Sequence, residues 1–157
     1  MPNWCENDVT IECEDLDSIL DFLHDEENLF SFDKLIPYPQ EYIEKDKAAE
    51  AAFKEGNYLP DGYNQGGYNW CIENWGTKWD ACETKMDRVD KDLIVFHFDT
   101  AWAPPEPVIE ALAKKFPTAI VSHEFFEGGM GFSGSARYEF GELVERNLGD
   151  YCGARGG

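Results

Sequence analysis

Apolar and polar residues alternate along several short stretches of this chain, and such alternation predicts strands that are buried on one side. In residues 3–13, for example, Val9, Ile11 and Cys13 fall on one face, while acidic and hydroxyl residues fall on the other. The strands predicted by this pattern are residues 3–13, 77–88, 92–102, 118–126 and 132–143.

A spacing of three and four residues between apolar positions predicts helices in other segments. Leu16, Ile19 and Leu23 follow this spacing within residues 15–27, where the first turn is acidic, as the helix dipole favours. Further helices are predicted within residues 41–57, 70–75 and 104–117, the second of these ended by Gly76 and the last by Pro117.

The order of the predicted elements is strand, helix, inserted helices, two strands, helix and two strands. Without the inserted helices and the last strand, this is a split βαβ arrangement, the ferredoxin-like α+β fold, in which two helices cover an antiparallel sheet of strand order 4-1-3-2. We therefore predict a single ferredoxin-like domain over residues 1–146, with an insertion at about residues 37–76 and an extra C-terminal strand. Residues 147–157 are predicted to be a flexible tail.

Charge is unevenly distributed along the chain. The 157 residues include 32 acids and 13 bases, a formal net charge of −19, and residues 1–33 contain 11 acids with no Lys or Arg. Such a field disfavours direct binding to DNA, RNA or an anionic membrane, and it favours binding to a basic protein surface. Because the chain has neither an apolar run of about 18 residues nor a signal sequence, we expect a cytoplasmic location.

Four stretches resemble the YubB-like proteins, a family carried by phages and plasmids. They are MPNWCENDVTI at the start, YNWCIENWGTKWDA from Tyr68, FDTAWAPPEPVIEALAKKFP from Phe98, and EFFEGGMGFSG from Glu124. The resemblance implies a ferredoxin-like domain and an origin in a mobile genetic element. It implies no activity and no catalytic residue, so candidate sites have to come from the residues themselves.

Aromatic residues gather in the stretch YNWCIENWGTKWDA and in the loop of residues 58–68 before it. One hypothesis is a cleft under this loop, where planar rings bury a small ligand and amide side chains orient it. The alternative is structural: two indoles fix the short helix 70–75 to the sheet, and the third enters the core. The candidate cleft residues are Tyr63, Tyr68, Trp70, Trp75 and Trp79.

No motif predicts catalysis, a cofactor or a metal ion. In the predicted strand order the first strand separates His97 from His123, so they are roughly 10 Å apart, too far for one shared ion. The glycines of EGGMGFSG have the spacing of a dinucleotide-binding motif, but a strand follows them where that motif requires a helix, which predicts a hairpin turn. We therefore predict a non-enzymatic protein without a cofactor.

The acidic segment supplies the leading functional hypothesis. Six acids along about 20 Å of predicted helix approach the charge spacing of a DNA strand, so the protein would imitate nucleic acid and occupy a basic surface of a host protein, with a nucleic-acid-binding defence complex as one candidate. Two alternatives stay open: a small-ligand or enzymatic module built on the aromatic loop of residues 58–79, and a structural domain whose acidity only keeps it soluble. The predicted partner-binding residues are Glu14, Asp15, Asp17, Asp21, Asp25, Glu26 and Glu27.

Overall fold

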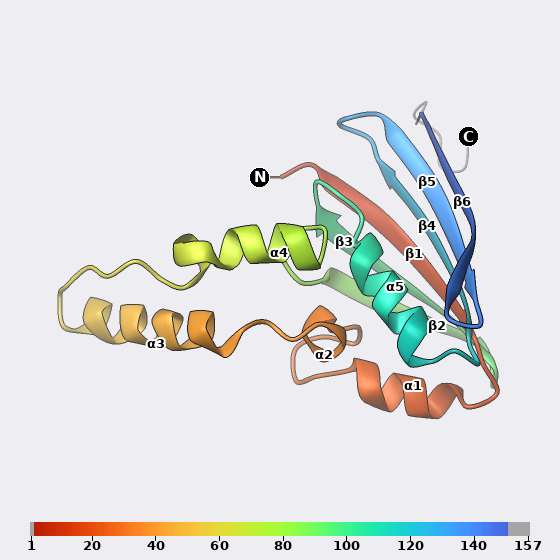
Figure 1. Cartoon of the computed structure of the whole chain (residues 1–157), viewed down its shortest axis with the longest axis horizontal. Helices are drawn as coiled ribbons and strands as arrows, with labels where there is room; N and C mark the ends of the chain where they lie inside the picture. Colours follow the sequence, from red (N-terminus) through yellow and green to blue (C-terminus); the bar gives the residue numbers. More distant parts are fainter. Residues whose placement is uncertain (1, 151–157) are drawn as a thin grey trace.

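The computed structural model describes residues 2–150 and contains one six-stranded antiparallel sheet with helices against one face (Figure 1). The strand order is β2-β3-β1-β4-β5-β6, so the first four strands of the chain follow the order 4-1-3-2 and the predicted ferredoxin-like α+β fold is confirmed. The strands are β1 (Trp4–Glu12), β2 (Cys82–Asp90), β3 (Leu93–Ala101), β4 (Ile120–Glu127), β5 (Phe132–Glu139) and β6 (Glu142–Asp150).

Two helices, α1 (Leu16–Leu23) and α5 (Glu106–Lys115), cover one face of the sheet, which we call the helix face (Figure 1). Strand side chains alternate between this buried face and the opposite, open face, as the sequence pattern predicts. The open face carries polar and charged side chains on its central strands. The core between the sheet and the two helices includes Val9, Ile11, Ile94, Phe96 and Val121 from the strands and Leu16, Ile19, Leu23, Val108, Ile109 and Leu112 from the helices.

The segment between α1 and β2, which includes the insertion predicted at about residues 37–76, forms an arm beside the sheet. It contains α2 (Phe32–Leu35), α3 (Gln40–Lys54), the irregular turn η1 (Tyr63–Gly67) and α4 (Tyr68–Asn74). Figure 1 shows α3 projecting away from the sheet, and none of its described residues is buried. Within residues 2–150, no helix is both long and apolar enough to cross a membrane.

The first helix is shorter than predicted. It ends at Leu23, because the chain then turns around the carboxylate of Asp25, which accepts hydrogen bonds from the backbone N–H groups of Glu27 (2.8 Å) and Asn28 (2.7 Å). Aspartate favours such local turns over a continuing helix. The prediction of six acids along one straight helix over residues 15–27 is therefore wrong.

The C-terminal region also differs from the prediction. Residues 132–143 do not form one strand, because Phe140 (φ 54°) and Gly141 (φ 76°) make a two-residue turn between β5 and β6. Residues 147–150, predicted to belong to a flexible tail, lie in β6 and pair with β5. Every residue of this edge strand is exposed, so its sequence lacks the alternation that identifies a half-buried strand. Residues 151–157 of the predicted tail lie outside the described part of the chain.

Candidate functional site

The seven acids predicted to bind a partner lie on α1 and in the segments that flank it, and the structure divides them into two groups. Asp17 forms an ion pair with Arg88 of β2 (2.7 Å), and Asp15 accepts a hydrogen bond from the Ser18 hydroxyl (2.8 Å). Burial opposes ionisation of Asp25, but the hydrogen bonds that it accepts in the loop outweigh burial and lower its pKa. The other four acids, Glu14, Asp21, Glu26 and Glu27, are exposed, as Asp15 and Asp17 also are.

Three of the five predicted cleft residues line a shallow pocket of about 320 Å³ next to α4. The lining residues are Asp33, Tyr38, Ile43, Tyr63, Cys71, Trp75, Lys78, Trp79 and Asp80. The other two predicted residues are close to the pocket but do not line it: Trp70 packs edge-on against Trp75, with ring centroids 5.4 Å apart, and Tyr68 packs edge-on against Tyr63 at 5.7 Å.

The indoles of this region have different environments. Trp75 is only 5% exposed, and its ring N–H donates a hydrogen bond to the carbonyl oxygen of Ile36 (2.9 Å), so it fixes α4 to the segment after α2. Trp79 is 38% exposed and precedes β2, so the alternative in which it enters the core as a strand residue is wrong. It is the exposed one of the three indoles in the predicted set, and it is accessible to a ligand or a partner.

Asp80 is the half-buried acid of this pocket. Its carboxylate accepts hydrogen bonds from the backbone N–H groups of Phe32 (2.9 Å) and Ala81 (2.7 Å), which holds the start of α2 against the start of β2. Burial raises the pKa of Asp80 to about 6, although these hydrogen bonds act in the opposite direction. Burial also raises the pKa of Tyr38 to about 12 and that of Cys71 to about 11, so neither is ionised at neutral pH.

The four stretches that resemble the YubB-like proteins meet at one end of the sheet, where β1 begins and β3 and β4 end (Figure 1). The Trp102 N–H donates to the carbonyl oxygen of Asn3 (2.9 Å), and the Thr77 hydroxyl donates to the carbonyl oxygen of Ala101 (2.8 Å). Gly129 of the β4–β5 turn lies so close to Asn3 that a Cβ at this position would be 2.5 Å from the Asn3 amide nitrogen. Segments that are far apart in sequence therefore build a single surface.

Three tryptophans and one lysine lie against one another on this surface, and we call Trp4, Lys78, Trp79 and Trp102 the tryptophan cluster. The Lys78 Nζ lies 4.3 Å from the ring centroid of Trp79 and 3.9 Å from that of Trp102. The rings of Trp4 and Trp79 are 6.2 Å apart. Our sequence reasoning identified only Trp79 among these four. The other three residues lie in the stretches that resemble the YubB-like proteins, and that position was the sequence signal for them. Only the strand order of the sheet brings these stretches together.

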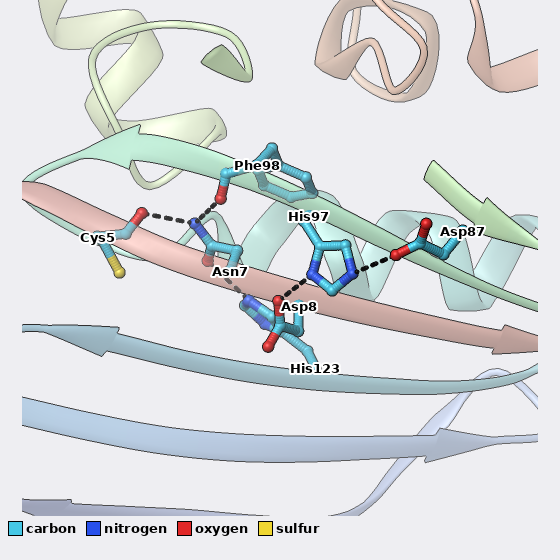
Figure 2. Close-up of polar contacts among 7 residues, drawn as sticks. All are labelled: Cys5, Asn7, Asp8, Asp87, His97, Phe98 and His123. Atoms are coloured by element: carbon cyan, nitrogen blue, oxygen red, sulfur yellow. Dashed lines mark hydrogen bonds and ion pairs between the residues drawn. The ribbon is translucent and has the colours of Figure 1, made fainter. Parts of the chain in front are cut away.

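Asn7 of β1 is a buried polar residue on the helix face of the sheet, and its contacts are drawn in Figure 2. The Asn7 amide nitrogen faces the Thr100 hydroxyl (2.9 Å) and the carbonyl oxygens of Cys5 (3.0 Å) and Phe98 (3.3 Å). Its amide oxygen therefore faces His123 Nε2 (2.9 Å), which must carry the proton. Burial lowers the pKa of His123 to about 4, so the ring is neutral at physiological pH.

On the open face, His97 lies between two aspartates, Asp8 of β1 and Asp87 of β2 (Figure 2). A histidine that activates a nucleophilic side chain as a general base needs a hydroxyl or thiol beside it. The residue opposite His97 on β2 is Lys85, which has an ammonium group instead. His97 and His123 lie on opposite faces of the sheet with β1 between them. Among residues 2–150, no group of three or more His, Cys, Asp or Glu side chains is arranged to hold a metal ion.

Comparison with known proteins identifies relatives of the chain. Residues 74–154 match the family described as "Ferredoxin-like domain in Api92-like protein". The chain is 36% identical to YubB of Escherichia coli (strain K12) over 80 residues, which are 50% of this chain and 54% of YubB, so the match spans about half the length of that relative. The family match begins in α4 and therefore excludes β1, which is nevertheless a central strand of the sheet.

A solved structure extends the likeness to nearly the whole chain. The crystal structure of api92 from Yersinia pseudotuberculosis has a TM-score of 0.59 and covers 98% of this chain and 99% of that one, at 11% sequence identity. At this identity the likeness shows the fold. It includes the N-terminal half of the chain, so β1 and the helical arm belong to the shared architecture.

Proposed function

The chain belongs to the family of the ferredoxin-like domain in Api92-like proteins, and from that premise we propose that it is a non-enzymatic protein that binds a basic surface of another protein. The family description concerns the fold, so the proposal is supported by charge. Eleven of the acids lie in residues 1–33, which contain no Lys or Arg. This segment includes the whole of α1.

The exposed carboxylates around α1 carry the proposal. The seven acids predicted to bind a partner include four exposed ones, Glu14, Asp21, Glu26 and Glu27. Asp17 is also exposed, and it forms an ion pair with Arg88 within the fold. An acidic surface steers a basic partner toward it and disfavours acidic ones. Protein surfaces that bind nucleic acid are basic because they contact phosphates. The partner class that fits best is therefore a nucleic-acid-binding protein, and a defence complex of a bacterial host is the candidate that agrees with the expected mobile-element origin.

We expect that reversing the charge of exposed acids at α1 weakens partner binding at least about tenfold, because like charges across an interface repel. The test variant is Glu14→Lys, Asp21→Lys and Glu26→Lys, because none of these three carboxylates bonds to another of residues 2–150. The immobilised chain is used to capture protein from a bacterial lysate at low salt. The proposal is supported if three conditions hold: the variant captures less of the partner, high salt releases the partner from the wild-type chain, and added duplex DNA displaces it.

The matched control reverses the same number of charges at a different part of the surface. Glu41→Lys, Glu44→Lys and Glu55→Lys change exposed residues in α3 or directly after it and alter the net charge by the same amount. Partner binding should survive in this control. Equal loss in both variants would mean that only the total charge matters, and a captured protein that DNA cannot displace would contradict the nucleic-acid-mimicking form of the proposal.

A second candidate function is supported by the pocket beside α4. Its volume of about 320 Å³, its aromatic walls and the half-buried carboxylate of Asp80 fit a small ligand that has an apolar ring and a hydrogen-bond donor. Such a ligand should change the fluorescence of wild-type protein but not of a Trp79→Leu variant that retains the other indoles. A fluorescence change that persists without Trp79 would place the ligand elsewhere, and no change across a panel of aromatic metabolites would contradict the pocket.

A further inference from the structure

We propose that the tryptophan cluster is a clamp for a cationic side chain of a partner peptide, and that Lys78 occupies the place of this side chain in the free protein. Both this inference and the proposed function involve a positively charged partner, and they have nothing else in common. The binding site differs, because the cluster lies where β1 begins and α1 follows the other end of that strand, about 27 Å away for nine extended residues.

The ring geometry carries the first step of the argument. An ammonium or guanidinium group binds the face of an indole when it lies within about 6 Å of the ring centroid, and Lys78 Nζ meets this condition for two rings at once, at 3.9 Å from Trp102 and 4.3 Å from Trp79. Both rings are nevertheless substantially exposed, at 45% and 38% respectively. Two exposed rings that hold a cation between them form a site that a cation from outside can enter.

The backbone at Trp102 supplies a second, independent observation. This residue has φ of 68°, a left-handed conformation that is unfavourable for a bulky side chain. It is the central residue of a tight turn in which the Ala103 N–H bonds to the carbonyl oxygen of Ala101 (2.9 Å), a strained arrangement when φ is positive. A glycine would fit this backbone without strain. Strain that displays an exposed tryptophan is the pattern found at ligand clamps.

Charge complementarity identifies the occupant as a cation. On the open face, the side-chain row next to Trp4 and Ala101 places the carboxylate of Glu6 directly opposite that of Asp99. Like charges at such positions destabilise a sheet. Burial raises the pKa of Asp99, and the neighbouring Glu6 and Glu83 carboxylates raise it further, while Lys85 lowers it. A basic peptide with one side chain between the indoles would bring its next positive charges over these carboxylates.

The groove on the open face is large enough for such a peptide to continue. It measures about 270 Å³ and is lined by Glu6, Asn7, Asp8, Glu83, Lys85, His97, Phe98 and Asp99. Arginine is the preferred occupant, because its planar guanidinium group stacks on indole faces and bonds to carboxylates with two parallel N–H groups. The geometry therefore points to an arginine-containing segment of a basic protein.

The test titrates the full chain with a short arginine peptide blocked at both ends, and it follows binding by calorimetry. Lys78→Ala should strengthen binding about fivefold, because it removes a resident competitor and a like charge. Trp102→Gly should weaken binding about tenfold while leaving the protein folded, since glycine suits the backbone at this position. The opposite signs of these two effects distinguish a clamp from general charge attraction.

Each variant has a matched control elsewhere on the chain. Lys114→Ala removes the same charge from the exposed surface of α5, and Phe140→Gly removes an exposed ring from another residue of positive φ. Both controls should leave affinity within about twofold of wild type. Any of three results would contradict the proposed clamp. They are equal effects of Lys78→Ala and Lys114→Ala on affinity, weaker binding of the arginine peptide by Lys78→Ala, and a preference of the wild-type chain for a glutamate peptide. The α1 charge-reversal variant should still bind the arginine peptide, so failure of the proposed function can be told apart from failure of the clamp.

Discussion

Replacement of Asn7 by leucine is expected to lower the free energy of unfolding by about 3 kcal/mol. The Asn7 side chain is buried and joins three strands, because its amide group bonds to Thr100 and Phe98 of β3 and to His123 of β4 from its own place in β1. Leucine is branched at the same carbon and is larger than asparagine, so it leaves no cavity, and the cost comes from the lost hydrogen bonds and from the added volume in the core. The largest part is the His123 ring N–H, which would be left buried without its partner.

A double-mutant cycle measures this interaction directly. His123→Leu alone should also be strongly destabilising, whereas Asn7→Leu combined with His123→Leu should cost about 1 to 3 kcal/mol less than the sum of the two, because the double variant leaves neither partner unsatisfied. Unfolding by urea, followed by far-ultraviolet circular dichroism, gives the four free energies. Asn147→Leu, at an exposed position of β6, serves as the control and should change stability by less than about 0.5 kcal/mol. Strict additivity would show that Asn7 and His123 do not interact.

The same variant connects the core to the tryptophan cluster. The Thr100 hydroxyl accepts a hydrogen bond from Asn7 and donates one to the carbonyl oxygen of Ala103 (2.7 Å), next to the strained residue Trp102. Asn7 therefore supports the turn that displays the indole. If the cluster binds an arginine peptide, Asn7→Leu should weaken that binding even under conditions where the variant remains folded.

The sheet could be predicted from the sequence because its central strands are buried on one face. Alternation identified β1 and β3 correctly, and the spacing of Leu16, Ile19 and Leu23 identified α1. The errors fall where burial imposes no pattern. The edge strand β6 is exposed along its whole length, and α1 ends because Asp25 bonds to the backbone of the following turn, an effect that no periodicity reveals.

The candidate sites were harder to predict for a related reason. The aromatic pocket was partly visible, because Tyr63, Trp75 and Trp79 lie within 17 residues of one another. The tryptophan cluster joins Trp4, Lys78 and Trp102, which are separated by dozens of residues and become neighbours only through the strand order. The buried partners Asn7 and His123 are also far apart in sequence. The only sign of them in the sequence was a polar residue on the core face of a predicted strand.

A second large effect is expected from pH. His123 is fully buried, and burial lowers its pKa from 6.5 to about 4. In the unfolded chain the imidazole takes up a proton as the pH falls through 6.5, whereas in the folded chain it does so only near pH 4. Over this interval the unfolded state binds more protons, so stability is fully present above pH 6.5 and decreases as the pH falls.

The expected loss is about 3 kcal/mol by the time the pH reaches the folded pKa, at about 1.4 kcal/mol for each unit of the difference. Other groups also titrate, and protonation of the many carboxylates changes the charge repulsion, so the measured quantity is the difference from a His123→Gln variant. Glutamine keeps an amide N–H for the Asn7 oxygen and does not titrate. The gap between wild type and this variant should therefore change by about 3 kcal/mol between neutral pH and pH about 4.

The exposed His24 provides the matched comparison, because His24→Gln removes an imidazole that lies at the surface beyond α1. Its stability difference from wild type gives the reference for the loss of one surface imidazole over the same pH range. A difference between wild type and His123→Gln that does not change with pH would mean that the His123 imidazole is charged or hydrated inside the fold. Protonation of His123 would add the second proton at Nδ1, a buried atom that has no hydrogen-bond partner among residues 2–150, while Nε2–H would still donate to Asn7. The pH effect therefore comes from burial and should persist in the Asn7→Leu variant.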